Sequence, residues 1–116
     1  MQTRSRFFEL LAQVNEVENK HHDKSPDINA QILLMRVAMA HHAGKPLNVT
    51  QAMGLSHIGS PAKLHRKIND LLTLDMIELA FVGNNRRTKF ITPSAKAYAV
   101  IDEMAHAAES VYDTVS

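Results

Sequence analysis

The chain of 116 residues contains no cysteine. Disulfide bonds, thiolate catalysis and cysteine-bound zinc are therefore excluded. Long apolar runs are also missing, because no stretch approaches the roughly 20 residues that a helix needs to cross a bilayer. Near the N-terminus, Glu9 follows Phe7 and Phe8 and interrupts what would be the apolar core of a signal peptide. We therefore expect a cytoplasmic protein with no membrane partner.

Signatures of catalysis and of metal binding are scarce as well. The sequence has no nucleophile-elbow glycine pattern, no glycine-rich phosphate loop and no paired-carboxylate motif. Its seven histidines include two adjacent pairs, His21 with His22 and His41 with His42. Neighbours on a helix point about 100° apart, whereas chelating pairs on helices favour i, i+4 spacing. We expect neither an enzyme nor a bound metal or cofactor.

What the chain does have is an uneven distribution of charge. The net charge is only +1, and a composition of 45% hydrophobic and 22% charged residues is ordinary for one soluble domain with a modest core. Residues 57–91 contain six Lys and Arg against three Asp and Glu, a local net charge of six minus three, or +3. Residues 97–116 contain four acidic residues and no Lys or Arg. The basic middle segment is typical of a local nucleic-acid-binding surface.

Hydrophobic periodicity predicts that most of the chain is helical. A first helix is expected over residues 3–20, and a polar linker over residues 21–26. The second helix, ending near residue 42, is apolar on most sides and is therefore expected to be central and buried. Asn48 is placed to cap a short helix that ends near Met53. Ser60 and Pro61 begin a longer helix, residues 60–74, whose apolar stripe leaves its basic residues facing outward.

The period changes to two after Asp75, which indicates a β-hairpin over residues 77–92 with its turn at residues 83–85. Thr92 and Pro93 repeat the cap-plus-proline pattern, so a last helix is expected from there to about residue 113. The predicted fold is mainly α with a two-stranded β wing. We predict a single domain over residues 1–116, with an N-terminal helix and linker (1–24), a winged helix-turn-helix core (25–93) and a C-terminal helix (94–116).

A short helix, a glycine-containing turn, a longer basic helix and a basic-tipped hairpin form the winged helix-turn-helix arrangement. The longer helix is about as wide as the major groove of DNA, and the hairpin is placed to reach a minor groove or the backbone. Ser60 is expected to act chiefly as a helix cap that also lies near phosphate. For the basic residues of the helix, the alternative is a solvated face without a ligand. The expected DNA-contacting residues are Ser60, Lys63, His65, Arg66, Lys67, Arg86, Arg87 and Lys89.

Residues 60–77, SPAKLHRKINDLLTLDMI, resemble the recognition helix of MarR-type regulators, and residues 85–93, NRRTKFITP, resemble their wing. The resemblance implies that Arg66 is the recognition-helix arginine and Arg87 the wing arginine. It also implies a homodimer that is held by its terminal helices and binds pseudo-palindromic operators. Many such proteins respond to small phenolic effectors, so a small-molecule effector is a possible partner.

Three features depart from the MarR-type pattern. Asn85 stands where an acidic residue is usual at the wing tip, and Asp75 stands where glycine is usual before the strand. In addition, only one helix is predicted after the wing, where the family typically has two. These departures bear on how the wing tip is held and on the geometry of the dimer.

The apolar stripes of the first and last helices are expected to form a dimer interface, because so small a domain has little core for them to cover. The expected interface residues are Phe7, Leu10, Leu11, Val14, Ile101, Met104, Ala108, Val111 and Tyr112. The leading hypothesis is a homodimeric, sequence-specific regulator of transcription that binds double-stranded DNA. The alternative is a winged-helix module for protein–protein contact, such as an adaptor or antirepressor, which the near-neutral net charge favours.

Overall fold

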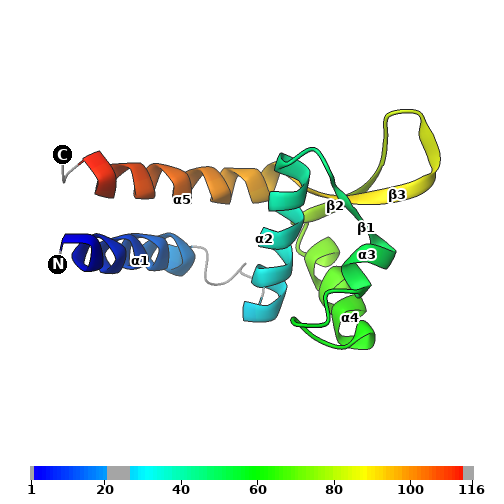
Figure 1. Cartoon of the computed structure of the whole chain (residues 1–116), viewed down its shortest axis with the longest axis horizontal. Helices are drawn as coiled ribbons and strands as arrows, with labels where there is room; N and C mark the ends of the chain where they lie inside the picture. The colour runs from blue at the N-terminus through cyan, green and yellow to red at the C-terminus, as the bar shows by residue number, and fades with distance from the viewer. Residues whose placement is uncertain (1, 21–26, 114–116) are drawn as a thin grey trace. The chain divides into compact units, whose positions relative to one another are not determined.

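A computed structural model of the protein describes residues 2–20 and 27–113. Their order of elements is α1 (Gln2–Lys20), α2 (Ile28–His42), β1 (Leu47–Asn48), α3 (Val49–Met53), α4 (Pro61–Thr73), β2 (Ile77–Val82), β3 (Asn85–Pro93) and α5 (Ala95–Asp113) (Figure 1). The prediction of a mainly helical winged fold is confirmed. The linker expected at residues 21–26, together with His21 and His22, lies outside the described residues.

The chain forms two compact units. One consists of α1 and the part of α5 from Tyr98 onward, and the other runs from α2 through β3 to Ala97. Within the second unit, the β2–β3 hairpin extends beyond helices α2, α3 and α4 (Figure 1). No helix in the described part of the chain is long and apolar enough to cross a membrane.

Helix α2 supplies much of the core of the second unit. Its N-cap is Asp27, whose side chain accepts a hydrogen bond from the Ala30 N–H at 2.9 Å. The helix contacts α4, β1 and β3 through its buried residues Ala30, Leu33, Leu34 and Val37. The opposite face was expected to be buried too, but Ile28, Ile32 and Met39 are exposed. Only one side of α2 is therefore covered by its own unit.

The two helices of the helix-turn-helix begin where the sequence predicts. Asn48 and Gln51 form a capping box at the start of α3, in which each side chain accepts from the other residue's backbone N–H. Ser60 caps α4, and Pro61 occupies its first turn. Most of the predicted apolar stripe of α4 is buried, namely Leu64, Ile68 and Leu71, whereas Leu72, the fourth residue of the stripe, is exposed.

The sheet has three antiparallel strands in the order β1-β3-β2, one more than the two-stranded wing that the sequence predicts. The additional strand β1 has two residues, and it pairs Leu47 with Ile91 and Asn48 with Phe90. At the other end, Val82 pairs with Asn85 across a two-residue turn. Gly83 is the first central residue of that turn and has a φ of 61°, as expected for a type II′ hairpin.

The last helix does not begin at the predicted cap. Thr92 and Pro93 belong to β3, where they pair with Glu78 and Ile77. The cap is Ser94 instead, whose hydroxyl oxygen accepts a hydrogen bond from the Ala97 N–H at 3.1 Å. The Thr-Pro pattern misled because a proline at the end of a ladder also satisfies the sheet, which needs no N–H from it there.

Candidate nucleic-acid interface

The exposed side chains of α4 include those of Lys63, His65 and Arg66, all with donor groups. They lie opposite the buried apolar stripe of the helix, as its periodicity predicts. Ser60 holds the start of this helix, and its hydroxyl oxygen accepts from the Lys63 N–H at 3.3 Å. The His65 ring lies against the side chain of Asn69 one turn later, with 3.4 Å between Nδ1 and Nδ2.

Lys67, which was predicted with this group, has a different environment. Its ammonium group forms an ion pair with the carboxylate of Asp27, and its side chain is only 14% exposed. Asp70 lies one turn away on the same helix, with 4.0 Å between Lys67 Nζ and the Asp70 carboxylate. The hydrogen bond from Lys67, followed by that from the Ala30 N–H, lowers the pKa of Asp27. Lys67 thus already has a partner within the fold.

The wing carries three exposed cations, Arg86, Arg87 and Lys89. Asn85, which replaces the usual acidic residue, organises the tip through the backbone. Its side-chain oxygen accepts from the N–H of Arg87 at 3.0 Å and from the N–H of Thr88 at 3.1 Å. This arrangement is an Asx turn, which fixes the backbone of the tip without an ion pair to the arginine side chain.

Phe81 is a component of the wing that sequence reasoning missed. The Arg86 guanidinium carbon lies 5.7 Å from the centre of its ring, and Lys89 Nζ lies 5.8 Å from it. These distances are those of cation–π contacts, so one exposed ring gathers two of the three wing cations. The available signal was an aromatic residue just before the hairpin turn, with arginine and lysine just after it.

The expected interface residues of the terminal helices differ in exposure. Phe7 and Leu11 are 55% and 42% exposed, and the neighbouring Phe8 is 60% exposed. Val111 is buried, and the side chain of Tyr112 is outside what the structure describes. The remaining residues of the set are half-buried, namely Leu10, Val14, Ile101, Met104 and Ala108. Large apolar side chains therefore stay in contact with water on α1.

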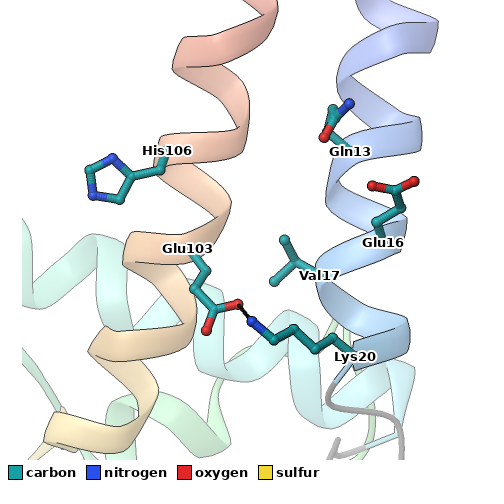
Figure 2. Close-up of a pocket in the computed structure, with 6 residues that line it drawn as sticks. All are labelled: Gln13, Glu16, Val17, Lys20, Glu103 and His106. Atoms are coloured by element: carbon teal, nitrogen blue, oxygen red, sulfur yellow. Dashed lines mark ion pairs between the residues drawn. The ribbon is translucent and has the colours of Figure 1, made fainter.

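An open groove of about 470 Å³ lies between α1 and α5 within their unit. Its lining includes only one aliphatic side chain, Val17, and a Lys20–Glu103 ion pair spans it at 3.5 Å. Figure 2 shows that His106, which also lines the groove, points away from α1. An ion pair therefore links the two helices across this groove, and apolar side chains do not fill it.

Comparison with solved structures identifies the architecture. RV1404 from Mycobacterium tuberculosis is similar over 97% of this chain and 71% of its own, with a TM-score of 0.64 and 15% identity. The transcriptional regulator Tm0710 from Thermotoga maritima is similar over 97% of this chain and 74% of its own, with a TM-score of 0.64 and 13% identity. Staphylococcus aureus MarR, in complex with salicylate and kanamycin, is similar over 90% of this chain and 65% of its own, with a TM-score of 0.58 and 13% identity.

No protein-family model matches the sequence, and no curated protein sequence is significantly similar to it. The likeness therefore lies in the structure, at sequence identities where the fold is shared and individual residues have diverged. The protein has a MarR-like winged-helix fold, as the recognition-helix and wing segments predicted.

Proposed function

We propose that the protein is a sequence-specific transcription regulator that binds double-stranded DNA as a homodimer. Helix α4 enters the major groove, and the β2–β3 wing contacts a minor groove or the backbone. The observation that carries the proposal is the exposed basic face of α4 beside an exposed basic wing, within a single compact unit of MarR-like fold.

The exposed residues divide by the chemistry of their side chains. Arg66 is assigned to base edges, because a guanidinium group donates two parallel hydrogen bonds to guanine in the major groove. Lys63 and the wing cations are assigned to phosphate, which supplies most of the affinity and makes it depend on salt. Ser60 places the helix N-terminus, where backbone N–H groups favour a phosphate. His65 is assigned to a polar contact.

The homodimer is proposed from the terminal helices. α1 exposes Phe7, Phe8 and Leu11 to solvent. Exposed aromatic and aliphatic side chains in such a stripe favour association with a second copy, which removes them from water. The complex of S. aureus MarR with salicylate and kanamycin supports extending the proposal to a small-molecule effector.

Selection from a random duplex library with the purified protein tests DNA binding and dimer symmetry together. The expected product is a pseudo-palindrome with half-site centres about 10 base pairs, or 34 Å, apart. On the selected duplex, Arg66→Ala is expected to weaken binding by about 1–3 kcal/mol and to relax preference at one base pair of each half-site. A library that shows no enrichment contradicts sequence-specific binding.

The dimer is tested separately by analytical ultracentrifugation. Leu11→Glu places a charge in the apolar stripe of α1 and is expected to yield monomers. Glu9→Lys, at an exposed position about 160° from Leu11 around the helix, is the control for a change of charge on α1 and is expected to remain dimeric. If Leu11→Glu sediments as a dimer like the control, α1 is not part of the dimer interface.

The second candidate, a winged-helix adaptor or antirepressor, is supported by the near-neutral net charge of +1. It predicts binding to DNA that is absent or insensitive to salt, together with a stable complex with another protein. A plot of log affinity for DNA against log salt concentration therefore separates the two functions. A DNA-binding regulator gives a negative slope of about 0.9 for each phosphate contact, whereas the adaptor gives a slope near zero or no binding.

A further inference from the structure

We infer that Lys67 is a positioning residue of the recognition helix and not a DNA contact, and that Asp27 is the residue through which it acts. The inference rests on the proposed function, since it concerns how α4 is presented to DNA. It separates one lysine of the basic helix from its neighbours, and it gives the residue that precedes α2 a role in recognition.

The first support is the double engagement of the Asp27 carboxylate. One of its oxygens, Oδ1, accepts from the Ala30 N–H at 2.9 Å and thereby caps α2. The other oxygen, Oδ2, accepts from the Lys67 ammonium group. A single side chain therefore joins the N-terminus of α2 to the middle of α4, forty residues later in the chain.

The second support is the charge around Lys67. Its ammonium group lies between two carboxylates, those of Asp27 and Asp70, so this cluster carries one positive and two negative charges. A phosphate approaching it meets a net negative charge. The side chain is also mostly covered, at 14% exposure, whereas Lys63 and Arg66 are exposed. Both features disfavour transfer of Lys67 to DNA.

The third support is that the other contacts which hold α4 in its unit are apolar and have no preferred direction. Leu64, Ile68 and Leu71 anchor α4 by apolar packing, which is strong but not directional. Rotation of α4 about its axis or a shift along it changes where Arg66 points. A charge-assisted hydrogen bond has a preferred direction and length. The ion pair therefore restricts rotation of α4 about its axis and its shift along that axis more than apolar packing alone does.

The experiment compares three substitutions in the full-length protein. Asp27→Asn keeps an efficient N-cap for α2 but removes the charge that holds Lys67. Lys67→Met keeps the apolar stem and removes the ammonium group. Lys63→Met makes the same chemical change one turn earlier on the exposed face and serves as the matched control. Each variant is titrated with the selected duplex and with a mixed-sequence duplex over a range of salt concentrations.

For Asp27→Asn and Lys67→Met, we expect the affinity ratio between the selected and mixed-sequence duplexes to fall by a similar factor, about three or more. The double variant should be no worse than either single one, because both changes break the same pair. Their salt slopes should match that of the wild type, whereas Lys63→Met should lose about 0.9 in slope. The inference is overturned if the salt slope of Lys67→Met also falls by about 0.9. It is likewise overturned if Asp27→Asn leaves the ratio of affinities for the selected and mixed-sequence duplexes unchanged.

A readout without DNA keeps this inference distinct from the proposed function. If the wild type shows no preference among duplexes, the proposed function fails, and the positioning role is then decided by amide hydrogen exchange of α4. Faster exchange of the α4 amides in both Asp27→Asn and Lys67→Met, with wild-type exchange in Lys63→Met, supports the role of the Asp27–Lys67 ion pair in positioning α4. Unchanged exchange in all three variants overturns it.

Discussion

The hydroxyl group of Ser94 donates a hydrogen bond to the carbonyl oxygen of Asp75 at 2.6 Å. The Ser94 hydroxyl oxygen also caps α5 by accepting from the Ala97 N–H, and the Ser94 N–H donates to the Met76 carbonyl at 2.9 Å. Ser94 is itself only 2% exposed. Ser94 therefore ties the turn between α4 and β2 to the residue that follows β3.

Asp75 has a φ of 58°, the left-handed conformation that glycine adopts readily and that aspartate tolerates better than most residues. We expect Asp75→Gly to be at least as stable as the wild type, with a gain of up to about 1 kcal/mol. Asp75→Ala should lose about 1 kcal/mol, because alanine tolerates a positive φ less well than aspartate or glycine. Urea denaturation of the three proteins measures the order, and an alanine variant as stable as the glycine variant would contradict it.

Ser94→Ala removes the bond to Asp75 and the cap of α5 in one change. We expect a loss of about 1–3 kcal/mol in the free energy of unfolding, because a part-buried carbonyl and a helix N–H both lose their partner. Ser110→Ala is the control, since that hydroxyl bonds to Ala107 on the exposed surface of its own helix. Its change should stay within about 0.5 kcal/mol. Similar losses for the two variants would show that the Ser94 contacts contribute little.

Phe81→Leu keeps an apolar side chain on the wing but removes the ring that Arg86 and Lys89 approach. If the wing contacts DNA, affinity should fall about two- to fivefold, which corresponds to the roughly 0.5–1 kcal/mol of an exposed cation–π contact. Phe81→Tyr retains an aromatic face and should bind like the wild type. Fluorescence anisotropy with the selected duplex makes the comparison, and equal affinities for the leucine and tyrosine variants would exclude this role of the ring.

The ion pair between Asp27 and Lys67 makes part of the stability depend on pH. Pairing lowers the pKa of Asp27 in the folded chain below its usual 3.8. The contribution is therefore complete at pH values above 3.8 and is lost as the pH falls through the lowered pKa. Asp27→Asn should cost roughly 0.5–1 kcal/mol at neutral pH, the range for a partly exposed pair.

The same cost should shrink towards zero in strong acid, because protonated aspartate and asparagine are then both neutral. Urea denaturation of the wild type and of Asp27→Asn at about pH 7 and about pH 2 tests this expectation. A cost that is the same at both pH values would show that the carboxylate charge is not what stabilises the pair.

Local signals made the helix-turn-helix predictable from sequence. Ser60 followed by Pro61, and Asn48 followed by Gln51, specify helix starts through bonds within three residues, which require no knowledge of the tertiary fold. The start of α5 was missed because Ser94 is defined as much by Asp75, nineteen residues earlier, as by its own helix. Strand β1 was missed for a related reason, since two residues carry no periodicity and gain their partner only from β3.

The candidate site was predictable to the same extent. The exposure of Lys63 and Arg66 follows from the helical period, whereas Lys67 was grouped with them because its pairing with Asp27 spans forty residues. Phe81 was read as part of a strand, because cation–π contacts become visible only once the register of the hairpin is known. Asp75 and Asn85 were noted only as departures, and the structure gives each a specific backbone role.

Asn48 is both the last residue of β1, paired with Phe90, and the cap of α3. The base of the wing and the first helix of the helix-turn-helix therefore share one residue, and neither can be lengthened there without disturbing the other. The turn at Gly83 is constrained by its φ of 61° and not by packing, because a side chain added at this glycine would meet nothing within 4 Å. Insertions that extend the wing should be tolerated at its tip alone, which makes the length of the wing a property that can be engineered separately from the helices.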